Sequence, residues 1–237
     1  MDDLLHGLIE VFYLIFVGNP ALFEIVALSL RVSCTALVFS TLVGIPLGVA
    51  LGSNRFVGRR LLVTMLYTGM GLPPVVVGLF VYLLLSRSGP LGQLNLAYIP
   101  PLFTPAAMVA AQSIISLPLV AGFTMAAVMA VDPQLRLQMR ALGATKVQST
   151  LAVLREARAG VVVAVIAGFG SIISEVGAVM IVGGNIEHRT RVLTTAIVLE
   201  TRKGNFDLAI TLGVVLLGLA FIANGAMLYL QGRTIEE

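Results

Sequence analysis

The chain has 237 residues, of which 58% are hydrophobic and 11% are charged, and its mean hydropathy is +1.00. A soluble domain carries about a quarter charged residues, so this composition excludes an ordinary soluble domain and indicates an integral membrane protein. The net charge of +3 does not indicate nucleic-acid binding, because the basic residues lie between apolar runs rather than in one stripe interleaved with aromatic residues.

Residues 1–21 are predicted to form an interfacial helix on the outer surface of the membrane. The apolar residues between positions 4 and 17 share one helical face, but this segment is short for a membrane span. The alternative is a sixth span at the same place. No Lys or Arg precedes Arg31, which is the wrong flank for a cleavable signal peptide, so we expect the mature chain to start at Met1.

Five apolar runs are each long enough to cross about 30 Å of hydrocarbon. They are predicted over residues 32–51, 61–86, 102–131, 159–182 and 208–230. Glycine and proline interrupt the second run at Gly69, Gly71 and Pro73-Pro74, where we expect a kink. Such breaks are tolerated where neighbouring helices satisfy the freed backbone groups, which predicts an all-α, polytopic transmembrane helical bundle.

Two sets of small residues are expected to let helices approach closely. They are Gly44, Gly48 and Gly52 in the first run, and Gly213, Gly218 and Gly225 in the fifth. The single cysteine, Cys34, lies in an apolar run and excludes an intrachain disulfide.

Basic residues predict the orientation of the chain, because Lys and Arg accumulate on the cytoplasmic side. They follow the first run, occupy residues 132–158 and follow the fifth run, which places the N-terminus outside and the tail of residues 231–237 in the cytoplasm. The segment of residues 183–207 fits poorly, because it is placed outside yet carries four basic residues. Within it, Thr190–Leu199 is predicted to form a short re-entrant or interfacial helix.

The loop of residues 132–158 begins with Asp132-Pro133, which is typical of a helix start with Asp as N-cap and Pro at the first helical position. Gly143 permits a sharp change of direction. The pattern predicts an amphipathic helix that either fits a groove on a soluble partner or rests on lipid headgroups. Its apolar side would hold Leu135, Leu142 and Val147, and its solvated side Arg136, Arg140 and Lys146.

The order Asp132-Pro133, then Ala141-Leu142-Gly143-Ala144-Thr145, then a helical stretch into the fourth run, resembles the cytoplasmic loop of ATP-binding-cassette (ABC) importer permeases, which carries their EAA motif. The resemblance covers residues 22–230 and implies a MetI-like type I importer fold in the prokaryotic plasma membrane, with residues 132–158 as the coupling loop. It also implies a homodimer with two cytoplasmic ATPases, which use ATP and Mg, and an extracytoplasmic binding protein. The implied ATPase-coupling residues are Arg140, Ala141, Leu142, Gly143, Ala144 and Thr145.

The chain departs from the family motif at two places. Leu137-Gln138-Met139 replaces its acidic and two small residues, and Arg155-Glu156-Ala157-Arg158 replaces the usual Leu-Pro. A second resemblance concerns the substrate: Ser174 to Ile186, followed by Thr190 to Ile197, looks like the tungstate-type branch of the oxyanion importers. Tungstate is therefore expected first, molybdate second and other small oxyanions, including sulfate, third.

Glu175 lies inside the fourth run, where a carboxylate is costly and is by default a functional hypothesis. It would repel an anion, so we expect a structural role, with the acid protonated or paired with Arg189 or Arg191; the alternative is a gate. Ser171 and Ser174 are the other pathway candidates, although their hydroxyls more commonly bond their own helix.

Asn185, Arg189 and Arg191 are candidates for an external mouth, where positive charge would draw an anion or meet a delivery protein. The alternative for the arginines is a pair of salt bridges with Glu187 and Glu200. His6 and His188 are single histidines and predict no metal site.

No Walker-type phosphate loop is present, so the chain is expected to hydrolyse no ATP and to bind no cofactor itself. Two rival functions are a membrane-embedded lipid-modifying enzyme that uses Glu175 with Arg189 and Arg191, and an ion-coupled secondary carrier. The first lacks a second carboxylate or a nucleophile with a base, and the second would predict a clear internal repeat.

Overall fold

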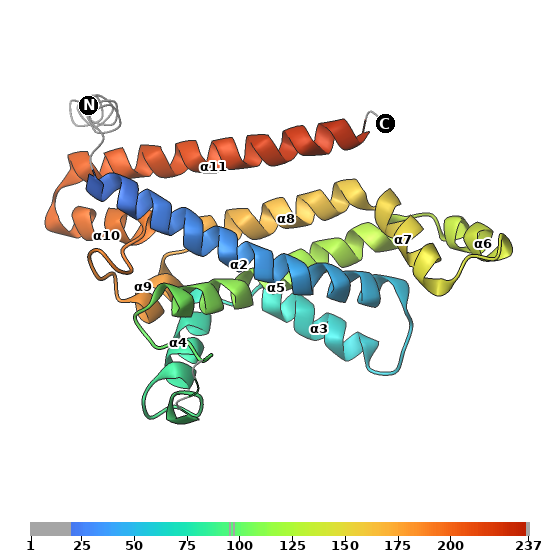
Figure 1. The fold of residues 1–237 in the computed structure, drawn as a ribbon, viewed down its shortest axis with the longest axis horizontal. Coiled ribbons are helices and arrows are strands. Elements are labelled where there is room, and N and C mark those ends of the chain that lie inside the picture. The colour runs from blue at the N-terminus through green and yellow to red at the C-terminus, as the bar shows by residue number, and fades with distance from the viewer. Residues whose placement is uncertain (1–19, 95, 97, 236–237) are drawn as a thin grey trace. The chain divides into compact units, whose positions relative to one another are not determined.

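The computed structural model describes residues 20–94, 96 and 98–235, and every regular element in these ranges is a helix (Figure 1). The expected interfacial helix of residues 1–21 lies outside the described residues, except for Pro20 and Ala21, which begin the first described helix. In chain order the elements are α2 (Pro20–Ser53), α3 (Arg59–Met70), α4 (Pro74–Leu85), the 3₁₀ helix η1 (Gly92–Leu94), α5 (Pro105–Ala130), α6 (Pro133–Ala141), α7 (Lys146–Glu156), α8 (Arg158–Ile173), α9 (Gly177–Gly183), α10 (Leu193–Lys203) and α11 (Phe206–Ile235).

Three of these helices, α2, α5 and α11, are long and apolar enough to cross a membrane. Two helix pairs, each interrupted by a short break, could each provide a further span: α3 with α4, and α7 with α8, which is bent by 68°. The predicted all-helical membrane bundle of about five spans is therefore confirmed. The expected break in the second run is also found, because α3 ends at Met70 and α4 starts with Pro74 at its first position.

Two boundaries differ from the sequence prediction. Helix α2 starts twelve positions before Val32, so Glu24 and Arg31 lie inside it rather than before it. The fourth run is not one helix, because α8 ends at Ile173 and α9 starts at Gly177. The break is stabilised by the side chain of Glu175, whose Oε1 accepts the backbone N–H of Ala178 at 2.9 Å.

The described residues fall into two compact units. The first unit contains residues 20–36, 73–112 and 172–223, apart from positions 95 and 97. Its helices α4 and α9 pack backbone to backbone: a Cβ on Gly78 would lie 2.6 Å from the Cα of Ala178. Its core also contains a cluster of four buried residues: Leu22, Leu193, Ala196 and Leu212.

The second unit contains residues 37–72, 113–171 and 224–235. Here the second half of α2 packs directly on α5, and a Cβ on Gly48 would lie 2.5 Å from the backbone oxygen of Ala121. This confirms the close approach predicted for the glycines of the first run. For Gly213, Gly218 and Gly225 no close approach is found within the described residues, because a Cβ on any of them would meet no heavy atom within 4 Å.

Candidate functional site

The start of α6, in the second unit, has the capping residue and the proline that the sequence predicts. Asp132 is the N-cap, and its Oδ1 accepts the N–H of Gln134 at 2.8 Å. Pro133 occupies the first helical position, where its missing N–H costs no hydrogen bond. The predicted helix start at Asp132-Pro133 is confirmed.

The turn between α6 and α7 is a helix stop followed directly by a helix start. Gly143 has φ +82, and the N–H groups of Gly143 and Ala144 donate to the carbonyl oxygens of Arg140 and Met139 at 3.0 and 2.9 Å, which is a Schellman motif. Thr145 then caps α7, and its side chain and that of Gln148 bond each other's backbone N–H. This capping box has a signature in the sequence, Thr-x-x-Gln, that the sequence analysis missed.

The α6–α7 turn exposes apolar side chains. Leu142 is 84% exposed and Val147 is 69% exposed, and Leu137 and Leu151 are also exposed. Arg140 and Lys146 are exposed beside them. The predicted mixture of apolar and basic side chains is found, but the apolar ones point away from the body of the chain.

Two residues of the predicted amphipathic pattern point elsewhere. Leu135 packs against the core cluster of Val49, Val128, Val153 and Ala157. Arg136, expected to be solvated, donates from Nη1 to the backbone oxygen of Ser53 at 3.0 Å and from Nη2 to Ser53 Oγ at 3.1 Å. Side-chain positions on a nine-residue helix depend on what it packs against, which periodicity does not show.

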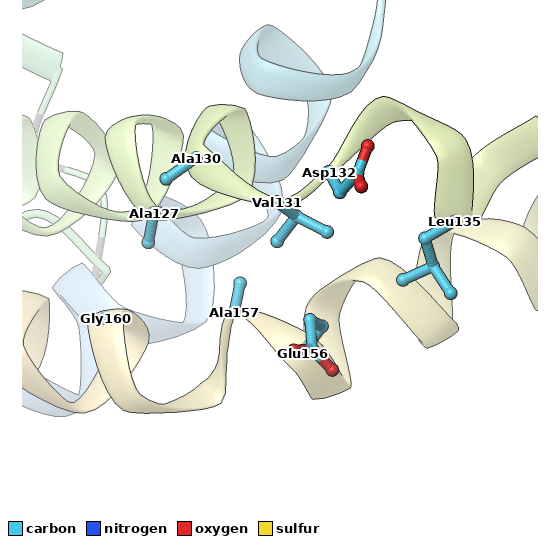
Figure 2. Close-up of a pocket in the computed structure, with 8 residues that line it drawn as sticks. All are labelled: Ala127, Ala130, Val131, Asp132, Leu135, Glu156, Ala157 and Gly160. Carbon is cyan, nitrogen blue, oxygen red and sulfur yellow. The ribbon is translucent and has the colours of Figure 1, made fainter.

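A groove of about 530 Å³ lies beside the start of α6 (Figure 2). Small and apolar residues dominate its lining, and the carboxylates of Asp132 and Glu156 lie at its edge with their oxygens turned away from Ala157. The full lining is Ala127, Ala130, Val131, Asp132, Leu135, Glu156, Ala157 and Gly160.

The pathway candidates lie around the break after α8. Ser171 belongs to the second unit and is half-buried, whereas Ser174 is exposed in the first unit. Glu175 is buried in the first unit; besides capping α9 through Ala178, its backbone oxygen accepts the hydroxyl of Thr194 at 2.9 Å. The structural role expected of Glu175 agrees with this bond, but the pairing with Arg189 or Arg191 is not found, because the Glu175 carboxylate bonds the backbone at the start of α9.

Polar side chains from several helices surround Glu175. Ser29, Ser33, Gln112 and Thr194 line a cavity of about 10 Å³ with it, close to the smallest volume that holds one water molecule. The Nε2 of Gln112 donates to the backbone oxygen of Ile172 at 3.0 Å, at the end of α8. Sequence reasoning missed these neighbours, because only packing brings residues of α2 and α5 next to position 175.

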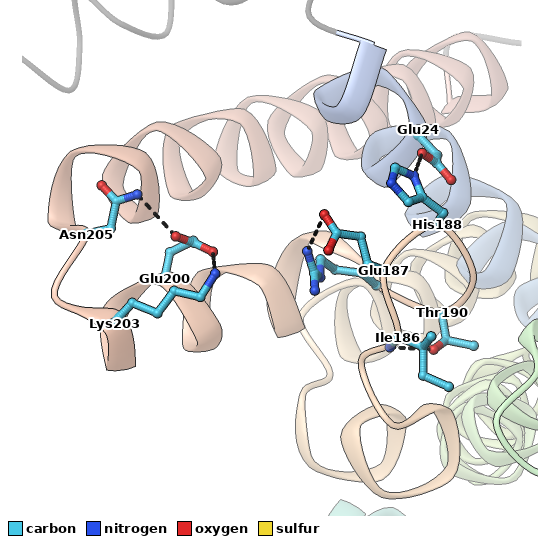
Figure 3. Close-up of polar contacts among 9 residues, drawn as sticks. Glu24, Ile186, Glu187, His188, Thr190, Glu200, Lys203 and Asn205 are labelled. Atoms are coloured by element: carbon cyan, nitrogen blue, oxygen red, sulfur yellow. Dashed lines mark hydrogen bonds and ion pairs between the residues drawn. The ribbon is translucent and has the colours of Figure 1, made fainter.

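The loop of residues 184–192, also in the first unit, folds back on itself (Figure 3). The carbonyl oxygen of Ile186 accepts the N–H groups of Arg189, Thr190 and Arg191 at 3.2, 2.9 and 3.0 Å. The hydroxyl of Thr190 donates to Gly183 O at 2.6 Å and accepts from Ile186 N at 2.9 Å. These bonds hold Asn185 at φ 50 within the loop.

The charged residues of this loop are mostly paired. Arg191 Nη1 lies 3.2 Å from Glu187 Oε1, and His188 Nδ1 lies 2.7 Å from Glu24 Oε2. The hydrogen bond and charge of Glu24 raise the pKa of His188 above its usual value. The alternative of a salt bridge to Glu187 is therefore found for Arg191.

Among the described residues, Glu200 makes no salt bridge with an arginine. It binds Lys203 Nζ at 2.7 Å and Asn205 Nδ2 at 3.1 Å. Of the three mouth candidates, Asn185 is half-buried, Arg191 is engaged with Glu187, and Arg189 is exposed and makes no ion pair with the described residues.

The sequence and the fold are similar to those of known transport proteins. Residues 44–236 match the family described as binding-protein-dependent transport system inner membrane component. The chain is 45% identical to a probable anion ABC transporter permease protein of Haloferax volcanii, over 90% of this chain and 92% of that protein. It is 39% identical to the tungstate uptake system permease protein TupB of Peptoclostridium acidaminophilum, over 98% and 99%. An inward-facing structure of the MetNI methionine ABC transporter shares the fold, with a TM-score of 0.71 and 16% identity over 91% of this chain and 94% of that one.

Proposed function

Because the chain belongs to the family of binding-protein-dependent transport system inner membrane components, we propose that it is the permease of an importer that passes tungstate into the cytoplasm. The chain is a multi-pass ABC importer permease of the MetI-like type in the plasma membrane. Its substrate, its partners and its orientation in the membrane are proposals that go beyond membership of this family. The N-terminus is placed outside and the C-terminus inside, as the basic residues indicate.

The α6–α7 turn carries the proposal of ATPase coupling. A leucine that is 84% exposed at the tip of a polar loop is typical of a docking surface, because exposed apolar clusters are otherwise unfavourable in water. Arg140 and Lys146 favour a partner cleft lined by acids. One ATPase would bind the turn of each of two permease copies, and hydrolysis of ATP with Mg in those subunits would drive the motion.

Substrate identity is supported by the relatives and by the charge of the 184–192 loop. Two relatives are named for anion and tungstate transport. Arg189 offers an exposed guanidinium near the proposed outer mouth, where positive charge raises the local concentration of an anion. A binding protein would deliver the oxyanion, and the path would run along the axis of a homodimer.

Replacing Gly143 tests the coupling proposal. Gly143→Leu forces a left-handed backbone onto a branched residue at the tip of the turn, which costs about 1 kcal/mol locally and displaces Leu142. We expect copurification of the ATPase and ATP-dependent uptake in proteoliposomes to fall together. Gly58→Leu is a matched control: Gly58 has φ +90, and, like Gly143, its Cβ would meet nothing within 4 Å. Equal ATPase association for both variants would contradict the proposal.

Competition measurements test the substrate. With the binding protein present below saturation, radiolabelled uptake should favour tungstate over molybdate, and both over sulfate. Equal uptake of tungstate and molybdate under these conditions would remove tungstate as the preferred substrate. It would leave the coupling proposal intact, because Gly143→Leu measures that separately.

A further inference from the structure

The C-terminal end of α2 is capped by side chains from two other helices. The last carbonyl groups of a helix lack partners inside it and need other donors. At this end, Ala50 O accepts from Asn54 Nδ2 at 3.0 Å, and Leu51 O accepts from Arg59 Nε at 2.7 Å. Ser53 O accepts from Arg136 Nη1 at 3.0 Å. Two positive charges therefore lie at the negative end of the helix dipole.

Arg136 differs from the other two donors because it comes from α6, 83 positions along the chain. Its planar guanidinium makes a second bond, from Nη2 to Ser53 Oγ at 3.1 Å. A two-point contact of this kind fixes orientation as well as distance, which a single flexible ammonium would not do. The helix that leads into the exposed turn is thus fastened by its side chain to the end of α2.

The end of α2 is in turn locked to α5. A Cβ on Gly48 would lie 2.5 Å from Ala121 O, and one on Gly52 would lie 2.9 Å from Val128 Cγ1. These two helices can shift past each other only by separating their backbones. Helix α6 follows α5 after only Val131 and Asp132, and Leu135 packs against the core cluster that includes Val49 and Val128. Arg136 adds the directional hydrogen bonds between α6 and the end of α2.

We propose that Arg136 is a positioning residue that converts movement of α6 into movement of the paired α2 and α5 helices. Without it, α6 would keep the chain connection and the non-directional packing of Leu135, which permit rotation about Val131 and Asp132, and much of the displacement of the α6–α7 turn would be lost in that rotation. This inference rests on the proposed coupling function. It assigns force transmission to one side chain that does not belong to the docking surface.

The test uses the complete transporter, with ATPase and binding protein, in proteoliposomes. Arg136→Gln removes the two-point contact. We expect ATPase copurification to stay within about twofold while oxyanion molecules transported per ATP hydrolysed fall about tenfold, which is within the usual range of coupling between sites. Arg136→Lys should recover part of the ratio through one bond to Ser53 O. Arg60→Gln removes an exposed arginine of α3 that makes no ion pair with the described residues, and should leave the ratio unchanged.

A second variant keeps the test valid if Arg136→Gln folds poorly. Ser53→Ala removes only the Oγ acceptor and should lower the ratio by about twofold, with no added effect in the Arg136→Gln background, because the two changes break one contact. An unchanged ratio in Arg136→Gln overturns the inference. So does a parallel loss of uptake, hydrolysis and melting temperature, which marks a purely structural contact. If Gly143→Leu also leaves ATPase association intact, the proposed coupling function fails as well. If only Arg136→Gln leaves the transport ratio unchanged, the positioning role alone fails.

Discussion

The α6–α7 turn and the 184–192 loop both reverse the chain through left-handed residues, but they use their polar groups in opposite ways. In the turn, the capping hydrogen bonds join only residues of α6, of α7 and of the turn itself, and the side chains of Leu142 and Val147 remain exposed. In the loop, one carbonyl oxygen receives three N–H groups, and Thr190 is fully buried. The comparison teaches that the turn leaves its apolar side chains uncovered by its own chain, which fits the proposed docking on an ATPase, whereas the loop is closed by internal bonds.

The largest expected difference concerns the leucine beside each segment. Leu193, the first residue of α10 after the loop, is fully buried in the core cluster with Leu22 and Leu212. Leu193→Ala should destabilise the protein by about 2 to 5 kcal/mol, because it leaves a cavity. Leu142→Ala should leave the thermal unfolding midpoint in detergent unchanged but weaken ATPase copurification. A large loss of stability in Leu142→Ala would break the comparison.

A smaller difference in stability is expected between Thr190 in the loop and Thr145 in the turn when each loses its hydroxyl group by the same substitution. Thr190→Val leaves Gly183 O and Ile186 N without their hydroxyl partner in a buried setting, which should destabilise the protein by about 2 kcal/mol. Thr145→Val removes an exposed helix cap, which should cost about 1 kcal/mol. Thermal unfolding of the two variants side by side measures both. A larger cost at Thr145 would show that the turn, rather than the loop, depends on its own hydrogen bonds.

The smallest effect concerns protonation of His188. Its pKa is raised by Glu24, so the pair with Glu24 is complete below the usual histidine pKa of about 6.5 and is lost as the pH rises through the raised value. In a His6→Gln variant, which leaves His188 as the single histidine, the rate of diethylpyrocarbonate modification should report an apparent pKa above 6.5. Glu24→Gln should lower that pKa towards 6.5. An unchanged titration in Glu24→Gln would contradict the ion pair that joins this loop to α2.

Local chemistry was predicted well where neighbouring residues alone decide it. Asp132-Pro133 starts α6, the Gly71 to Pro74 segment separates α3 from α4, and Gly143 turns the chain after α6. At Glu175 the expected structural role agrees with the structure, but the backbone partner was not predicted, because a single carboxylate in an apolar run does not reveal whether it faces a cation, a path or a backbone N–H. The prediction was wrong at Arg136, because a basic residue on an amphipathic helix is expected to be solvated, whereas this one bonds Ser53.

The sequence by itself determined the class of protein, the break between α3 and α4 and the helix start at Asp132-Pro133, because composition and short-range backbone preferences act within a few residues. Only the tertiary structure decided that Thr194 bonds the backbone of Glu175, that His188 pairs with Glu24 and that Arg136 fastens α6 to Ser53. The physical reason is desolvation. A buried or half-buried polar group must find a partner wherever packing brings one, and the sequence does not state which groups packing brings together.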